Sequence, residues 1–169
     1  MRIIKNIGLT MVCPQHLIAV LLCVVLMAPA ARTAEKPLLM PSAKDKCPVC
    51  GMYVMKYPDW ITVISFKNGS YAYFDGAKDM FKFLQTPSKY KQVRTGGIRA
   101  IFIRDYYSLE WFDARRASFV IGSDIYGPMG RELIPLKSEA DAREFANDHR
   151  GKKILNFSEI TPEIIKTLD

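Results

Sequence analysis

The stretch CPVCGMYVM (residues 47–55) places two thiols and two thioethers within nine residues. Side chains of this kind serve zinc knuckles, thiol–disulfide exchange sites and soft-metal sites. A closed zinc site needs four ligands, which usually come from two cysteine pairs. No second pair follows residue 50. A zinc site would therefore need a dimer or the help of carboxylates.

Thiol–disulfide exchange is the alternative function. In oxidoreductases that use Cys-x-x-Cys, the motif follows a strand and caps a helix that lowers the pKa of the attacking thiol. Here the residues after Cys50 favour a β-strand, and no substantial strand is predicted before Cys47. The sequence context therefore does not favour exchange.

Thiolate and thioether ligands together select Cu(I) over zinc and over hard ions. Cys50 and Met52 are two residues apart, so on an extended strand their side chains would face the same way. Met55 would project to the opposite face, and we interpret it as a packing residue. The expected third ligand is Met129, in the turn YGPMG (residues 126–130), unless it is a loop methionine that covers the edge of the core.

The N-terminus has the features of a secretory signal. Arg2 and Lys5 precede a twelve-residue apolar run, LIAVLLCVVLMA, which is short for a membrane span of roughly 20 residues. Ala28-Pro29-Ala30 then matches the small-x-small pattern of a cleavage site. We expect residues 1–30 to be a signal peptide and the protein to be periplasmic or located in the cell envelope. Cys23 leaves a lipoprotein or an anchored form open.

Residues 31–46 lack periodicity and are predicted to be a flexible tether, followed by the domain at 47–169. Beyond residue 30 the chain has 22 basic and 17 acidic residues, without a run of five like charges. This dispersed charge argues against a nucleic-acid partner. Cys47 and Cys50 are the cysteines that remain, and a disulfide between them would close too short a loop to stabilise the fold much. A functional role is the better interpretation of this pair.

Local patterns predict two similar halves. The first half combines a strand (59–66), an Asn-Gly hairpin turn (67–70), a strand (70–74), a helix capped by Asp75 with apolar positions 77, 80, 81 and 84, and a strand (98–105). The second combines a strand (117–123), a strand (132–136) placed at an edge by Pro135, a helix opened by Ser138 with Asp141, a strand (153–157) and a short helix after Thr161. The order predicts an α+β fold of two ββαβ units, which form a single domain with a mainly antiparallel sheet.

The motifs CxxCGM, DGAKDMFKFL and PMGRELIPLKSEADAREFANDHRGKKILNFSEI, in this order, resemble the NosL family over about residues 47–160. These are copper proteins of the bacterial cell envelope that are associated with the maturation of nitrous-oxide reductase. The resemblance implies two ββαβ units and one Cu(I) ion on Cys50, Met52 and Met129. It also implies nitrous-oxide reductase or its assembly ABC transporter as partners, and membrane attachment through the N-terminus, since family members are commonly lipoproteins.

Two residues keep alternative roles. Cys47 is either a further copper ligand or half of a disulfide that disables the site. His149 is the one histidine beyond residue 30 and would be the family's histidine ligand, but a cation near a helix C-terminus is also stabilised by the helix dipole. No serine–histidine–acid set, paired-histidine motif or phosphate loop is present. We therefore expect an exported Cu(I) carrier, not an enzyme.

Overall fold

The computed structural model describes residues 40–90 and 97–169. The predicted signal peptide lies outside these residues. Residues 40–46, at the end of the predicted tether, are joined to the domain by a hydrogen bond from Val54 N to Asp45 O and by a bridge between Lys46 and Tyr53. Among the described residues, no helix has the length and apolar character needed to cross a bilayer.

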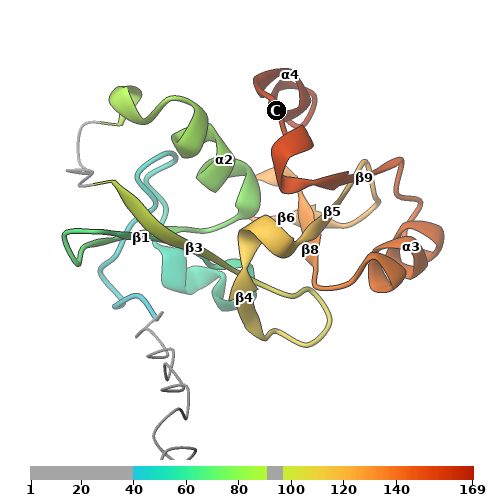
Figure 1. Ribbon diagram of the computed structural model, residues 1–169, viewed down its shortest axis with the longest axis horizontal. Helices are drawn as coiled ribbons and strands as arrows, with labels where there is room; N and C mark the ends of the chain where they lie inside the picture. The colour runs from blue at the N-terminus through green and yellow to red at the C-terminus, as the bar shows by residue number, and fades with distance from the viewer. Residues whose placement is uncertain (1–39, 91–96) are drawn as a thin grey trace, which may run out of the picture. The chain divides into compact units, whose positions relative to one another are not determined.

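The first half is a four-stranded antiparallel sheet with one helix (Figure 1). Its strands lie in the order β2-β1-β3-β4. The elements are η2 (Val54–Lys56), η3 (Pro58–Trp60), β1 (Thr62–Phe66), β2 (Tyr71–Phe74), α2 (Ala77–Gln85), η4 (Pro87–Lys89), β3 (Ile98–Arg104), β4 (Trp111–Asp113) and η5 (Ala114–Arg116).

The hairpin between β1 and β2 turns where the sequence predicts it. Gly69 has φ +83°, which a glycine adopts without steric cost, and Asn68 Oδ1 accepts from Ser70 N. The start of β1 was predicted wrongly, at residue 59. Pro58 opens the 3-10 turn η3, so the strand begins only at Thr62. All five residues of β1 are buried, as is expected of a strand between two neighbours.

The second half is a three-stranded antiparallel sheet in the order β8-β5-β9, with one main helix. Its elements are β5 (Ser118–Ile121), β6 (Tyr126–Gly127), β7 (Gly130–Arg131), β8 (Ile134–Leu136), α3 (Glu139–Asp148), β9 (Lys153–Asn156), η6 (Phe157–Glu159) and α4 (Pro162–Lys166). Pro135 lies in the edge strand β8, as predicted. The predicted loop at residues 126–130 is the short hairpin β6–β7.

The two halves share one topology. In each half the first strand lies between the second and the third, as β2-β1-β3 and as β8-β5-β9. The helix precedes the third strand in both. The predicted pair of ββαβ units and the α+β class are therefore confirmed, while β4 and the β6–β7 hairpin are additions that the sequence did not predict.

One large core cluster contains residues of both halves. An edge-to-face contact with ring centroids 5.4 Å apart joins Phe81 of α2 to Phe119 of β5. Met80 is fully buried in this core, as predicted. Figure 1 shows α4 beside α2, and the two helices are in contact. The core thus fixes the position of α2.

Candidate metal centre

Two thiols and two carboxylates converge in the first half of the fold. One ligand atom each from Cys47, Cys50, Asp75 and Asp79 lies within 4.8 Å of the others, and we call this group the thiol–carboxylate cluster. Cys47 Sγ is 3.3 Å from Asp79 Oδ2. Cys50 Sγ is 3.4 Å from each carboxylate oxygen of Asp75. Neither cysteine forms a disulfide. This set of donors fits a metal site.

The cysteines lie on a closed turn. Cys47 N donates to Met52 O and Gly51 N donates to Cys47 O, and the donor–acceptor distance is 2.9 Å in both hydrogen bonds. Gly51 has φ +79°, a left-handed conformation that strains other residues. The expectation of an extended strand through Cys50 and Met52 was wrong. The chain turns at Gly51 and then enters η2, so the two side chains are related by a turn and not by the pleat of a strand.

The carboxylates come from the beginning of α2. Asp79 is in the first helical turn, and Asp75 directly precedes the N-cap residue Gly76. The prediction that Asp75 caps α2 was wrong, because Gly76 occupies that position and Asp75 accepts from the Cys50 thiol instead. Negative charge is stabilised near a helix N-terminus. The sequence signal for both residues was the presence of two carboxylates at the start of a predicted helix.

Both thiols hold their protons tightly. Burial raises the pKa of Cys47 well above its ordinary value, and the charges of Asp75 and Asp79 raise it further. Burial likewise raises the pKa of Cys50 to about 12, with a further contribution from Asp79. Hydrogen bonds from main-chain N–H groups of the turn stabilise the thiolates and so lower the pKa of both cysteines in part. A metal must therefore displace the thiol protons when it binds.

Glu132 and Lys78 tie the β6–β7 hairpin to α2. Glu132 is buried, and its Oε1 accepts from Lys78 N at 2.6 Å and from Leu133 N at 2.9 Å. Burial raises the pKa of Glu132 to about 7. A Cβ on Gly76 would lie 2.4 Å from Glu132 Oε2, so glycine permits this close approach. Lys78 Nζ in turn donates to Met129 O over 2.9 Å.

The predicted copper ligands occupy three environments. Cys50 and Met52 are partly buried in the cysteine turn. Met129 is 41% exposed in the β6–β7 turn, and its carbonyl is held by the residue that precedes Asp79. His149 lies at the C-cap of α3, where its Nδ1 is 3.4 Å from Asp124 Oδ1. Among the described residues, the cluster of candidate ligand atoms does not include this histidine.

Met55 lies in η2 and packs against the core, as predicted. The carboxylates Asp75 and Asp79 are site residues that the sequence reasoning missed. Cys47 is 2% exposed and Cys50 is partly exposed, so the two thiols differ in their access to solvent.

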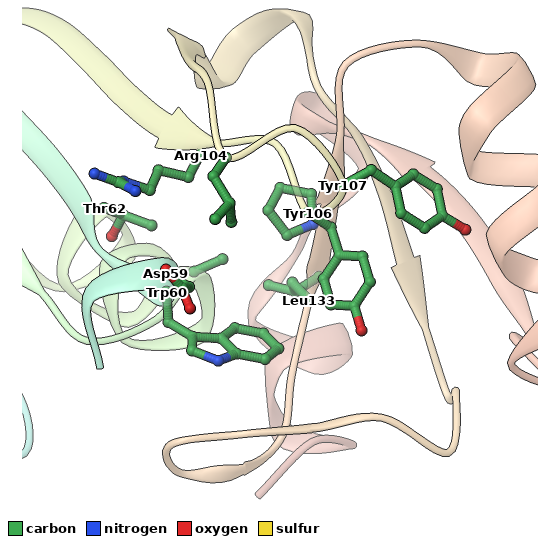
Figure 2. A pocket seen from close by; sticks show the side chains of 10 residues that line it. Asp59, Trp60, Thr62, Arg104, Tyr106, Tyr107 and Leu133 are labelled. Carbon is green, nitrogen blue, oxygen red and sulfur yellow. The ribbon is translucent and has the colours of Figure 1, made fainter. Parts of the chain in front are cut away.

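A separate cavity of about 340 Å³ is lined by residues of both halves of the fold. Figure 2 shows it between the Trp60 and Tyr106 rings, with Leu133 beside them and Arg104 across from Tyr106. No cysteine, methionine or histidine lines this cavity. It is therefore not the metal centre, although Ala77 of α2 contributes to its wall.

The model of the NosL family matches residues 39–165. The chain belongs to the NosL family. One NosL relative, the copper-binding lipoprotein NosL of Stutzerimonas stutzeri, is 26% identical over 130 residues. The match covers 72% of this chain and 65% of that relative, so the chain spans somewhat less than two thirds of the relative's length.

Two solved NosL structures are similar to this chain. The crystal structure of the copper chaperone NosL from Shewanella denitrificans has a TM-score of 0.62 at 24% identity, and the match covers 75% of this chain and 99% of that one. The solution structure of the apo-NosL protein from Achromobacter cycloclastes has a TM-score of 0.46 at 22% identity, covering 62% and 87%. The Shewanella structure supports the NosL fold of this chain.

Proposed function

We propose that this NosL family protein is an exported Cu(I) carrier that binds one ion through Cys50, Met52 and Met129. The observation that carries the proposal is the partly exposed Cys50 thiol, which shares a closed turn with the Met52 thioether. Thiolate and thioether donors together favour Cu(I). The relatives, named as copper-binding and as a copper chaperone, support the choice of metal.

Met129 is the proposed third ligand. Lys78 Nζ donates to the Met129 carbonyl, and this hydrogen bond links the β6–β7 turn to α2, the helix that carries Asp79. The thioether is exposed at the turn of a two-residue hairpin, where it contributes little to the core. We propose that this thioether completes the copper site of the cysteine turn.

Copper is the cargo of this protein, and the ligand set suits transfer. Three sulfur donors leave a coordination position for an incoming thioether or imidazole. A ligand of the partner protein can therefore bind the copper ion before Cys50 dissociates from it. The exposure of Met129 gives that partner an approach to the site.

We further propose nitrous-oxide reductase or its assembly ABC transporter as the recipient, or another envelope copper enzyme. The family supplies the argument for the first two. The predicted signal peptide and the lipoprotein name of the Stutzerimonas relative support a place in the periplasm or cell envelope. Attachment to the membrane through the N-terminus would keep the carrier near such partners.

An anaerobic titration tests the ligand set. The reduced protein is titrated with Cu(I) against a competing chelator, beside Cys50→Ala, Met52→Ala and Met129→Ala. We expect one-to-one binding that each of these substitutions weakens at least about tenfold, or about 1.4 kcal/mol. The matched control for Met129 is Met40→Ala, because Met40 is 42% exposed and Met129 is 41% exposed.

Two outcomes of this titration would contradict the proposed site. Binding that depends on Cys50 but not on Met52 or Met129 would remove the methionines from it. Binding that is lost only when Cys47→Ala and Cys50→Ala are combined would indicate a dithiol site.

Disulfide exchange between Cys47 and Cys50 is the second candidate function. Burial and the neighbouring carboxylates raise the pKa of both thiols, whereas the attacking thiol of an exchange site has a lowered pKa. The raised pKa of both thiols therefore does not favour disulfide exchange. Reduction of a model disulfide by the metal-free protein, at a rate lost in Cys47→Ala and Cys50→Ala, would favour it over the copper carrier.

A further inference from the structure

The guanidinium of Arg104 lacks the acceptors that a charged group in a folded protein normally has. Arg104 ends β3 and lines the cavity of about 340 Å³, which we call the Arg104 cavity. Its Nε is buried and has no hydrogen-bond partner, the one such side-chain atom within residues 40–90 and 97–169. Its Nη2 lies 3.4 Å from the thioether sulfur of Met40, which is a weak acceptor. In this part of the chain Arg104 forms no ion pair. Because a buried donor without an acceptor costs free energy, this guanidinium favours the binding of an anion.

We propose that the Arg104 cavity binds a small organic acid with one aromatic ring. The carboxylate of the acid pairs with the Arg104 guanidinium, and the ring packs against Trp60 and Tyr106. This site lies apart from the metal centre, since none of the described residues that line the cavity is a cysteine, methionine or histidine. The acid is therefore a second ligand of the protein, and its binding does not depend on the proposed copper function.

The setting of Arg104 suits a planar carboxylate. Arg104 pairs with Trp111 across β3 and β4, and its guanidinium carbon lies 4.8 Å from the centre of the Trp111 ring. This cation–π contact fixes the face of the guanidinium and leaves its N–H edge available. A guanidinium edge can donate two parallel hydrogen bonds to one carboxylate. The acid thus supplies the acceptor that Nε lacks among the described residues.

The walls of the cavity suit an aromatic ring. The Trp60 and Tyr106 rings meet edge to face with their centroids 6.2 Å apart, and Leu133, which also lines the cavity, is fully buried. Figure 2 shows the Arg104 side chain across the cavity from the Tyr106 ring. An apolar cavity of about 150 Å³ already holds benzene. The Arg104 cavity, at about 340 Å³, therefore has room for one ring and a short carboxylate chain.

One rim of the cavity is formed before any ligand binds. Leu109 lines the cavity from the loop between β3 and β4, and its φ of +58° is a left-handed conformation that is strained for a leucine. Asp105 holds the loop in this conformation. Its carbonyl accepts from Leu109 N, its Oδ2 accepts from Ser108 N, and its Oδ1 accepts from Lys137 N. Strained residues of this kind cluster at ligand sites, where the surrounding structure holds them in place.

The charges around the cavity favour an acid with a single negative charge. Among the described residues that line the cavity, Arg104 is the one basic residue. Asp59 also lines it, but Asp59 is exposed, so water and salt screen its charge. A phosphate with two negative charges would need a further cation, whereas Arg104 balances one carboxylate.

Pairs of acids and amides test this site without any variant. The probes are benzoate, phenylacetate and 3-phenylpropionate, each beside its primary amide, and calorimetry measures their binding to the reduced, metal-free protein. Each amide keeps the ring and the shape of its acid but carries no charge. We expect at least one acid to bind saturably and at least about tenfold more tightly than its amide, because hydrogen bonds to charged groups are the stronger ones. Equal affinities within every pair, or no saturable binding of any acid, would overturn the proposal.

Two variants then locate the bound acid. Arg104→Gln should weaken the binding of the acid about tenfold and leave that of the amide unchanged, whereas Trp60→Leu should weaken both about fivefold. Arg99→Gln is the matched control, because Arg99 is exposed on the same strand and does not line the cavity. An affinity for the acid that Arg104→Gln leaves unchanged would overturn the proposal. Failure of Met52→Ala and Met129→Ala to weaken copper binding would overturn the copper site and leave this result standing, since the acids are measured without metal.

Discussion

The buried carboxyl of Glu132 should make the stability of the protein depend on pH. Burial raises its pKa in the folded protein from 4.5 to about 7. Between these values the native state holds a proton that the unfolded state has released. The free energy of unfolding should therefore fall as the pH rises, with the stabilising contribution complete below pH 4.5 and lost above about pH 7.

The magnitude follows from the size of the shift. One pKa unit corresponds to about 1.4 kcal/mol, so the difference between about 7 and 4.5 amounts to ~3 kcal/mol. In Glu132→Gln the amide carbonyl can still accept from Lys78 N and Leu133 N, but the side chain does not ionise. The variant should lack this decline in stability.

Urea unfolding of the metal-free, reduced protein at pH 4.5 and pH 8 measures the effect. We expect the stability of the wild type relative to Glu132→Gln to fall by ~3 kcal/mol between these values. Glu144→Gln is the control, because Glu144 is exposed on α3 and its substitution should leave the pH dependence of the wild type intact. A relative stability that is flat, or that rises with pH, would refute the argument from burial.

Three further substitutions test local features of the fold by urea unfolding. Gly51→Ala should destabilise the protein by ~1–2 kcal/mol through backbone strain alone, since Gly51 has φ +79° and a Cβ would meet nothing within 4 Å; a neutral effect would show that the cysteine turn relaxes. Ser138→Ala should cost ~1 kcal/mol, because it removes the capping hydrogen bond that Asp141 N donates to Ser138 Oγ, and Ser138→Thr should restore most of this stability. Phe145→Ala should cost ~3–5 kcal/mol, because Phe145 is fully buried, and a loss below 1 kcal/mol would contradict its place in the core.

The features that the sequence predicts well have local causes. Asn68-Gly69 encodes a tight turn, Ser138 encodes a helix start, and Pro135 cannot donate to a central ladder. Each of these signals acts within a few residues of the structure it produces. For this reason the order of strands and helices follows from the sequence, and with it the pair of ββαβ units.

The thiol–carboxylate cluster could not be predicted in the same way. The cysteines meet the aspartates over separations of 25 and 32 residues, and these contacts depend on how the cysteine turn packs against α2. An aspartate directly before a helix is commonly its cap. Asp75 was therefore interpreted as a cap and not as a member of the metal site. The same holds for the exposed Met129. The sequence YGPMG predicts the turn in which Met129 lies, but it does not predict which residues lie near this turn in space.

We propose that copper binds to Cys50, Met52 and Met129. A crystal structure of the Cu(I)-loaded protein, with anomalous scattering recorded at the copper edge, would locate the ion. We predict one copper peak within bonding distance of Cys50 Sγ, Met52 Sδ and Met129 Sδ. A peak that bridges Cys47 Sγ and Cys50 Sγ, with the Met129 thioether still in solvent, would show that the proposed ligand set is wrong.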